Sequence, residues 1–388
     1  MRFNKKRRKL EIRAWYRVDL IVGAYTVDTT QIRKALLKLG AKRLLIQSPL
    51  GLRAVATELA KTLEAEGYSV LLSNSACWGA CDVAYQEAEN LEADAIIHLG
   101  HTKFMKHDKI PTIYIPCHYW NPAPLINLIP RISNVLNDAG ARRIGLGASI
   151  QWSIHLELVK TELKKSGIEA LTHEPKMFAV EEAQVLGCDY TALKPLEDKV
   201  DAFVVVGSVF HALGMALVSD KPTYAIDPAA QSIRELTENK RRIINQRYAN
   251  IMKFKEAERI GIIVSTKPGQ KRINIVNPIA RILQNHGKEV YVISADEVNE
   301  QLIIEYGLDA YVNTACPRLS IEDQVRFSRP LLLPAEVLVA VGILEWSFLV
   351  EKGLIMFPWA YSDENSKTVW RLIAGEAYGR RQVSQYEV

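Results

Sequence analysis

The chain has 388 residues, of which 48% are hydrophobic and 24% charged, and its formal net charge is +5. The length allows two or three domains with sizeable cores. The first 13 residues carry a net charge of +6, so the rest of the chain carries −1. This distribution argues against direct nucleic-acid binding, which needs a basic face on a folded domain.

The N-terminal segment 1–24 is predicted to be a basic tail followed by a lead-in to the fold. Blocks of like charge are usually solvated, so we expect the tail to be disordered. No apolar stretch follows the basic run, which argues against a secretory signal. The most apolar region, 331–357, contains a proline and four charged residues and is not expected to span a membrane. These features favour a cytoplasmic protein.

A unit of strands and helices occurs three times along the chain. Each copy begins with a basic residue and a β-rich run, at 43–46, 143–146 and 259–264. A helix follows, with apolar residues at three- and four-residue spacing. Each helix is predicted to end at a glycine, because glycine tolerates the left-handed conformation of helix ends. These glycines are Gly67, Gly167 and Gly287.

Three further strands follow in every copy, which gives each copy four strands. The second strand of the copy starts after the glycine, the third starts with Asp-Ala, and the fourth starts with a proline. Their ranges are 68–72, 94–97 and 111–115, then 168–171, 201–206 and 222–226, then 288–292, 309–312 and 330–333. Strands that alternate with helices predict parallel sheets covered by helices.

The predicted fold is therefore α/β, with three tandem homologous modules that are each a small four-stranded parallel sheet flanked by helices. The repeat places the modules at 25–125, 126–240 and 241–388. The charged stretch 234–258 is expected to be a helical connector between the second and third modules.

Three of the five cysteines occupy the positions where parallel sheets bind ligands, beyond the carboxyl ends of strands. Cys81 and Cys188 follow the second strands of the first two modules, and Cys316 follows the third strand of the last. If the modules form a triangle with these edges inward, the three thiolates meet at a central point. Three sulfur ligands leave one coordination site without a protein ligand, and this pattern favours a [4Fe–4S] cluster over zinc.

The other two cysteines do not fit this pattern. Cys117 lies at the end of a strand and is predicted to be a buried structural residue. Cys77 forms a C-x3-C pair with Cys81, but Ala84 stands where a usual radical S-adenosylmethionine enzyme has its third cysteine. The local three-cysteine motif of those enzymes is absent. Cysteine usage as a whole favours a reducing compartment over disulfides.

Around the three cysteines, the chain resembles the archaeal diphthamide synthases of the Dph2 type, a family of three-module proteins. The segments that carry the resemblance are 78–82 (WGACD), 185–188 (VLGC) and 313–318 (NTACPR), with support from 47–52, 98–101 and 265–270. The basic extension before Trp15 and the extra thiol of Cys77 depart from the family pattern.

The resemblance implies a function and a set of ligands. Cys81, Cys188 and Cys316 would hold a [4Fe–4S] cluster that cleaves S-adenosylmethionine between sulfur and the γ-carbon. The aminocarboxypropyl radical would be transferred to a histidine of elongation factor 2, and methylthioadenosine would be released. The resemblance also implies an external electron donor and a homodimer.

The loops after the first strands offer backbone donors and amides for binding S-adenosylmethionine. Gln151 and Gln270 are predicted to contact it there, and the alternative is that each amide satisfies the backbone of its own turn. His98, His101 and His211 lie near the carboxyl ends of third strands, where a structural role is the more common one. No catalytic base is predicted.

Two other functions fit an α/β fold. A nucleotide-binding oxidoreductase should carry G-x-G-x-x-G between the first strand and its helix, and the loops at 48–52, 149–152 and 265–269 do not contain it. A non-catalytic partner subunit of a heteromeric synthase could lack one cluster ligand, whereas this chain has three candidates.

Overall fold

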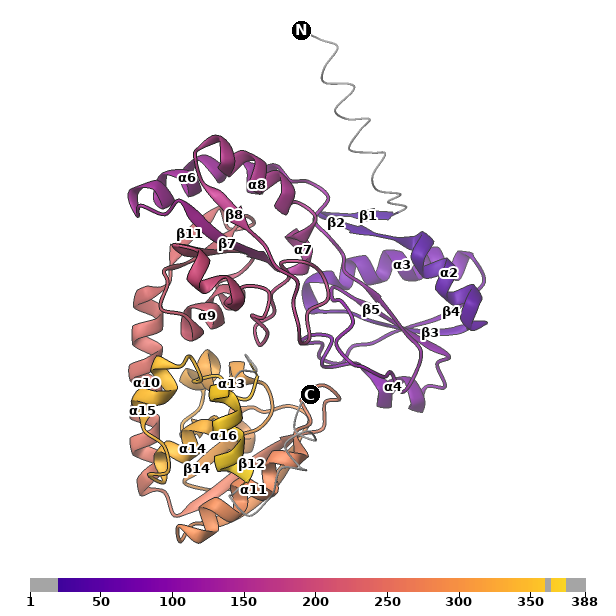
Figure 1. Cartoon of the computed structure of the whole chain (residues 1–388). Helices are drawn as coiled ribbons and strands as arrows, with labels where there is room; N and C mark the ends of the chain where they lie inside the picture. The colour runs from indigo at the N-terminus through magenta and orange to yellow at the C-terminus, as the bar shows by residue number, and fades with distance from the viewer. Residues whose placement is uncertain (1–19, 360–363, 375–388) are drawn as a thin grey trace. The chain divides into compact units, whose positions relative to one another are not determined.

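The computed structural model of the chain describes residues 20–359 and 364–374 (Figure 1). It contains two compact units. Of the described residues, unit 1 includes those up to Ala123 and the segment Ile150–Ile154, and unit 2 includes Pro124–Ser149 and those from His155 onward. The basic tail lies outside the described residues, so its disorder stays a prediction. No helix within the described residues is long and apolar enough to cross a membrane.

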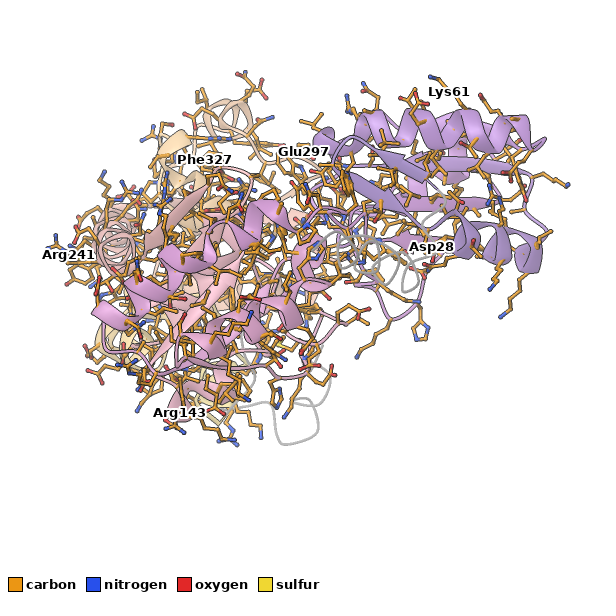
Figure 2. The ribbon with its side chains drawn as sticks, turned by 90° about the horizontal axis from the view of Figure 1, so that it is seen from above. Asp28, Lys61, Arg143, Arg241, Glu297 and Phe327 are labelled. Atoms are coloured by element: carbon orange, nitrogen blue, oxygen red, sulfur yellow. The ribbon has the colours of Figure 1, made fainter. Side chains whose placement is uncertain are left out.

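Unit 1 contains one parallel sheet of the order β4-β3-β5-β6. Its strands are β3 (Arg43–Gln47), β4 (Ser69–Leu72), β5 (Ala95–Leu99) and β6 (Thr112–Ile115). Helices α2 (Thr29–Leu39) and α3 (Arg53–Ala65) cover one face, and α4 (Tyr85–Asn90) covers the other. Asp28 caps α2 by accepting from the Gln31 amide at 2.9 Å, and Figure 2 shows Lys61 on the outward side of α3.

Shorter elements complete unit 1. A separate antiparallel pair joins β1 (Leu20–Val22) to β2 (Tyr25–Val27), and the helical turns η1 (Leu50–Leu52) and α7 (Ile150–Ser153) belong to the same unit.

Unit 2 contains two more parallel sheets, and they repeat the strand order of unit 1. The first has the order β11-β10-β9-β7-β8, and the second has the order β13-β12-β14-β15. Their strands are β7 (Arg143–Ala148), β8 (Glu169–Leu171), β9 (Ala202–Val206), β10 (Thr223–Asp227), β11 (Ser232–Glu235), β12 (Arg259–Ser265), β13 (Glu289–Ala295), β14 (Ala310–Asn313) and β15 (Leu331–Leu332).

The helices of unit 2 are α5 (Ala123–Ile126), which starts at the unit boundary, α6 (Ile129–Asp138), α8 (Leu156–Lys165), α9 (Val209–Val218), α10 (Thr237–Glu256), α11 (Ile273–Asn285), α12 (Glu300–Glu305), α13 (Pro317–Ile321), α14 (Pro334–Ala340), α15 (Trp346–Glu351) and α16 (Glu364–Ala374), with 3-10 turns η2 (Lys194–Lys199) and η3 (Asp323–Arg326). The α/β class and the four parallel strands of each repeat are thus confirmed. The bounds of the three modules stay a prediction.

The glycines predicted to end the first helix of each repeat do so. Gly67, Gly167 and Gly287 follow α3, α8 and α11 directly after a single capping residue, with φ of +91°, +76° and +75°. An added Cβ at Gly67 or Gly287 would meet no atom within 4 Å, so the left-handed backbone, and not lack of space, requires glycine there.

A carboxylate joins the first and third strands of every repeat. The aspartate before each third strand accepts hydrogen bonds from the two amides that open the first strand. Asp94 accepts from Lys42 and Arg43, both at 2.7 Å, and Asp201 accepts from Arg142 and Arg143, both at 2.8 Å. Asp309 does the same with the amides of Glu258 and Arg259, at 3.3 and 2.8 Å. The Asp-Ala pattern therefore has a structural cause that the three sheets share.

Unit 2 departs from the sequence prediction between its two sheets. The charged stretch 234–258 was expected to be helical throughout, but Arg234 lies in β11, a fifth strand that pairs antiparallel with β10. The turn between them is closed by Asp227, whose carboxylate accepts from the Ala230 amide at 3.0 Å. The helix α10 then begins at Thr237.

A buried ion pair anchors the helix α10 to the third repeat. Arg247 is fully buried, and its Nε donates to Glu336 Oε1 at 2.8 Å. Its other nitrogens donate to the carbonyls of Ser320 and Leu331, both at 2.8 Å. A buried charge is tolerated only when it is paired and hydrogen-bonded, as Arg247 is here.

Candidate functional site

In unit 1, the loop between β4 and α4 carries Cys77 and Cys81 beyond the carboxyl end of the sheet. Gln47, the last residue of β3, is only 1% exposed and holds this loop. Its Nε2 donates to the carbonyl of Asp82 at 2.7 Å, and its Oε1 accepts from the amide of Ala84 at 3.0 Å. The residue Cys81 is itself partly exposed. The main chain next to Cys81 is therefore fixed by a buried side chain.

Two histidines lie beside this loop at the end of β5. The buried His98 contacts Gln47 through Nδ1 at 2.9 Å, and its Nε2 lies 3.0 Å from His101 Nδ1 and 4.0 Å from Cys77 Sγ. Burial holds the pKa of His98 well below its usual value, and the neighbouring His101 lowers it further. His98 is therefore neutral near pH 7.

In unit 2, Cys188 lies in a loop that continues the edge of the second sheet, where Gln184 forms a parallel bridge with Ala148 at the end of β7. The next residue, Asp189, is fully buried and organises the loop. Its Oδ2 accepts from the amides of Phe178 and Ala179 at 2.7 and 2.8 Å. Cys188 is partly exposed.

Cys316 lies directly before α13, beyond the carboxyl end of β14. The buried Asn313 fixes this turn from both sides: its Nδ2 donates to the Cys316 carbonyl at 2.8 Å, and its Oδ1 accepts from the Ala315 amide at 2.9 Å. Thr314 adds a bond from its hydroxyl to the Ile263 carbonyl at 2.7 Å. Cys316 is also partly exposed.

Aromatic and cationic side chains connect the two cysteines of unit 2. The guanidinium carbon of Arg318 lies 4.8 Å above the ring of Phe210, and that ring packs against the backbone of Gly187. Tyr190 is fully buried, which raises its pKa well above the usual value, and the charges of Cys188 and Cys316 both raise it further. The structure thus brings Cys188 and Cys316 near one phenol, while Cys81 lies at the corresponding edge in unit 1.

The predicted glutamines occupy different environments. Gln151 donates through Nε2 to the carbonyl of Gly100 at 2.6 Å and more weakly to that of Pro116 at 3.4 Å. Both of its amide protons are therefore used on backbone outside its own turn. Gln270 is buried in the loop after β12, where its backbone N–H donates to the Lys267 carbonyl at 3.1 Å. Contact of either glutamine with S-adenosylmethionine stays a prediction.

Two further residues singled out from the sequence are also located. His211 lies in α9 with Nδ1 3.0 Å from Ser208 Oγ, and burial together with Arg318 lowers its pKa to about 4. Cys117 is 1% exposed, and burial raises its pKa to about 12. Cys117 is thus buried, as predicted.

Sequence reasoning missed the residues that hold the cysteine loops, chiefly Gln47, Asp189 and Asn313. Each is a polar side chain next to an apolar run or a cysteine, which is a weak signal in a single sequence. Their bonding partners become apparent only from the folded chain.

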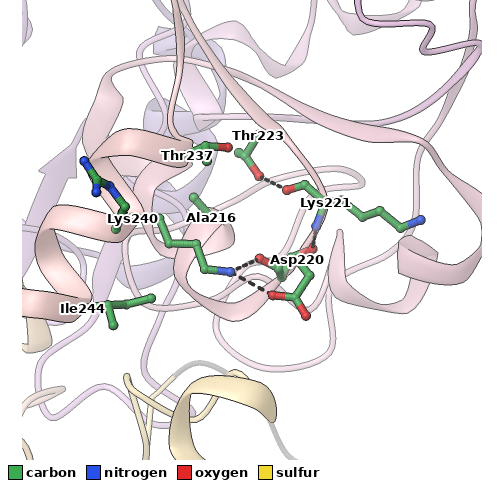
Figure 3. Close-up of a pocket in the computed structure, with 9 residues that line it drawn as sticks. Ala216, Asp220, Lys221, Thr223, Thr237, Lys240 and Ile244 are labelled. Atoms are coloured by element: carbon green, nitrogen blue, oxygen red, sulfur yellow. Dashed lines mark hydrogen bonds and ion pairs between the residues drawn. The ribbon is translucent and has the colours of Figure 1, made fainter. Parts of the chain in front are cut away.

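A surface pocket of about 260 Å³ lies away from these loops, at the amino end of β10 (Figure 3). Lys221, Lys240 and Arg241 contribute to its wall. Lys240 already donates to the Ser219 carbonyl at 2.7 Å and pairs with Asp220 at 3.0 Å. The pocket is at the opposite end of the sheet from the cysteines and contributes nothing to their site.

Comparison with known proteins identifies the family. A family model for diphthamide synthesis proteins matches residues 48–350. The 2-(3-amino-3-carboxypropyl)histidine synthase of Pyrococcus horikoshii is 33% identical over 322 residues, which are 83% of this chain and 92% of that protein. A protein of the same name from Methanocaldococcus jannaschii is 26% identical over 274 residues, which are 69% of this chain and 73% of that protein.

A solved structure agrees with the sequence comparison. The crystal structure of Dph2 from Pyrococcus horikoshii with a 4Fe–4S cluster superimposes with a TM-score of 0.74 at 33% identity, covering 82% of this chain and 91% of that one. The family match spans well over half of the chain, and it includes all three cysteine segments. The chain therefore belongs to the diphthamide synthesis family and is an enzyme of that family.

Proposed function

We propose that this enzyme transfers the 3-amino-3-carboxypropyl group of S-adenosylmethionine to a histidine of elongation factor 2. The transfer would use a [4Fe–4S] cluster held by Cys81, Cys188 and Cys316. The observation that carries the proposal is a partly exposed cysteine at the carboxyl edge of each of the three sheets, in a chain 33% identical to a named synthase over most of its length.

The chemistry of the three cysteine sites fits such a cluster. Thiolates are the usual ligands of iron–sulfur clusters, and three of them leave one iron open. Each cysteine lies in a turn whose backbone is held by a buried side chain, namely Gln47, Asp189 or Asn313. Such fixed turns lower the entropy cost of assembling a cluster.

When bound, the cluster supplies the electron that breaks the bond between sulfur and the γ-carbon of S-adenosylmethionine. The target imidazole exchanges a C–H bond for a C–C bond, and methylthioadenosine and a proton leave, so the overall reaction consumes no electrons. The protein's own part is to orient the substrates, because orientation determines which bond is cleaved.

The amides of the first-strand loops are proposed to bind S-adenosylmethionine. Gln151 offers it only an oxygen acceptor, because both of its amide protons are used on Gly100 and Pro116. Gln270 is the corresponding candidate in the third repeat. The proposal further includes an external electron donor, a homodimer and a cytoplasmic location, as the family resemblance implies.

Single alanine variants test the cluster ligands. We expect Cys81→Ala, Cys188→Ala and Cys316→Ala each to lower bound iron and to abolish activity, because two remaining thiolates do not retain the cluster. Iron content and the broad visible absorption of anaerobically purified protein are the measurements. Cys117→Ala and Cys77→Ala are the controls and should retain iron. Normal iron in Cys188→Ala would contradict the ligand assignment.

Product analysis tests the reaction. With dithionite, S-adenosylmethionine and archaeal elongation factor 2, mass spectrometry should detect methylthioadenosine and one aminocarboxypropyl group on a histidine. Deoxyadenosine as the main nucleoside would refute the proposed cleavage. An unmodified elongation factor would refute the substrate, and replacing its target histidine is the matched control.

A further inference from the structure

We propose that Cys77, His98 and His101 form a second, mononuclear metal site, separate from the three cluster cysteines, and that it takes Zn²⁺. The ligand atoms are Cys77 Sγ, His98 Nε2 and His101 Nδ1, and all three lie within 4.8 Å of one another. Thiolate and imidazole together form a donor set that zinc prefers in proteins.

The distances between the donor atoms suit one tetrahedral ion. With zinc–nitrogen bonds of about 2.0 Å and a zinc–sulfur bond of about 2.3 Å, neighbouring ligand atoms are separated by roughly 3.3–3.6 Å. In the structure, His98 Nε2 lies 3.0 Å from His101 Nδ1 and 4.0 Å from Cys77 Sγ. Small side-chain rotations therefore bring the three atoms around one ion.

Gln47 fixes His98 in the tautomer that binds metal. The main chain determines the orientation of the Gln47 amide, because its Nε2 donates to the Asp82 carbonyl and its Oε1 accepts from the Ala84 amide. The atom that faces His98 Nδ1 at 2.9 Å is therefore an acceptor, and Nδ1 must carry the proton. The lone pair of His98 is left on Nε2, directed toward His101 and Cys77.

The hydrogen bond between His98 and Gln47 is of the kind that orients zinc-binding histidines. Metal-binding histidines almost always donate their other ring N–H to a hydrogen-bond acceptor, which orients the ring. His98 is fully buried and Gln47 is 1% exposed, so neither can readily reorient. Cys77 and His101 are partly exposed, which provides a route for the ion.

Metal binding requires the protons at the site to rearrange. Because His98 Nε2 is an acceptor, His101 Nδ1 donates to it at 3.0 Å when no metal is bound. An ion takes the lone pair of His101 Nδ1, so the ring proton then lies on His101 Nε2, and Cys77 binds as the thiolate.

A bound ion would connect the loop that carries Cys77 to the end of β5. Cys81 lies four residues further along the same loop, so the ion would help to fix a proposed cluster ligand. That consequence rests on the proposed function, whereas the metal site itself does not.

The test uses the full chain with Cys188→Ser and Cys316→Ser, which removes two cluster ligands and leaves unit 1 unchanged. Metal-free, reduced protein is titrated with Co²⁺, a spectroscopic substitute for Zn²⁺, and then with Zn²⁺ as competitor. We expect one Co²⁺ per chain, with a thiolate-to-cobalt charge-transfer band and the strong visible absorption of tetrahedral cobalt. Zn²⁺ should displace it.

Further substitutions in this background identify the ligands. Cys77→Ser should abolish the charge-transfer band, His101→Ala should weaken binding at least tenfold, and Gln47→Leu should weaken it by roughly 10–100-fold. Cys81→Ser and Cys117→Ser are the matched controls and should bind normally. Circular dichroism of each variant checks that it is folded.

Three results would overturn the site. They are the absence of stoichiometric cobalt binding, cobalt binding that survives Cys77→Ser, and loss of binding in Cys81→Ser, which would assign the metal to the C-x3-C pair instead. In the wild-type enzyme, metal analysis should find one zinc beyond the iron, and Cys77→Ser should lose the zinc while it keeps the iron. If Cys81, Cys188 and Cys316 proved not to hold a cluster, the result of the cobalt titration would be unchanged.

Discussion

At the scale of single residues, Gly187 is a position in the cysteine loops where the ring of Phe210 leaves no room for a side chain. A Cβ at this position would lie 1.7 Å from Cζ of Phe210, a distance that real contacts do not allow. The same ring carries Arg318, two residues beyond Cys316. One glycine thus allows the Cys188 loop and the Cys316 turn to pack on the same aromatic ring.

We expect Gly187→Ala to lower the free energy of unfolding by about 1–3 kcal/mol, because the added methyl group displaces Phe210 or the loop. Iron content should fall with it. Thermal unfolding and iron analysis are the measurements, and Gly187→Ala combined with Phe210→Ala should recover part of the lost iron. Gly51→Ala is the control, because a Cβ there meets no atom within 4 Å. An unchanged Gly187→Ala protein would contradict this packing.

At the scale of elements, each of the three sheets has an aspartate at the same position, and these carboxylates make the sheets sensitive to acid in the same way. Backbone hydrogen bonds are the main cause that lowers the pKa of Asp94, Asp201 and Asp309 below the usual value. The unfolded chain then binds more protons than the folded one. The stabilisation is present above the unfolded pKa of about 3.9 and is lost as the pH falls through the lower folded value.

We therefore expect Asp201→Ala to lower the free energy of unfolding at pH 7 by about 1 kcal/mol, a modest value because the carboxylate is solvent-exposed and screened. The difference from wild type should shrink as the pH is lowered below 4. Urea unfolding at several pH values measures it, and the same series on Asp138→Ala, at an exposed site in α6, is the control for removing a surface carboxylate. A difference that is independent of pH would rule out the carboxylate bond.

The elements also show which features a single sequence encodes. The positions of the strands, the helix ends and the cysteines at carboxyl edges depend on local periodicity and on glycines, so they could be predicted. The bonds of Gln47 could not, because they join residues 35 and 51 positions apart. β11 was missed because its pairing depends on a turn closed by Asp227, within a stretch whose charge pattern favours helix.

At the scale of the whole molecule, the packing does not follow the order of the chain. Unit 1 holds one of the three sheets and unit 2 holds the other two, and the segment Ile150–Ile154 belongs to unit 1 although β7 and α8 on either side belong to unit 2. Trp152 in this segment is 3% exposed and stacks on Tyr119 with ring centroids 4.2 Å apart. The amide of Tyr119 also donates to the Gln151 carbonyl at 3.0 Å.

We expect Trp152→Ala to destabilise unit 1 by about 3–5 kcal/mol, the usual cost of removing a large buried aromatic side chain. Hydrogen exchange should accelerate around β6 and Tyr119, while β9 and β12 in unit 2 keep their protection. Faster exchange confined to β7 and α8 would show that the segment supports its chain neighbours instead.

The position of this segment also affects synthesis on the ribosome. Unit 1 is incomplete when Ala123 emerges, because Gly100 and Tyr119 still await their partners on Gln151. The apolar strand β7 must emerge before those partners do, while β8 and β9, which flank it in the finished sheet, have yet to be translated. The nascent chain therefore exposes an unpaired strand during the completion of its first folded unit, and this interval is where a chaperone would protect it from aggregation.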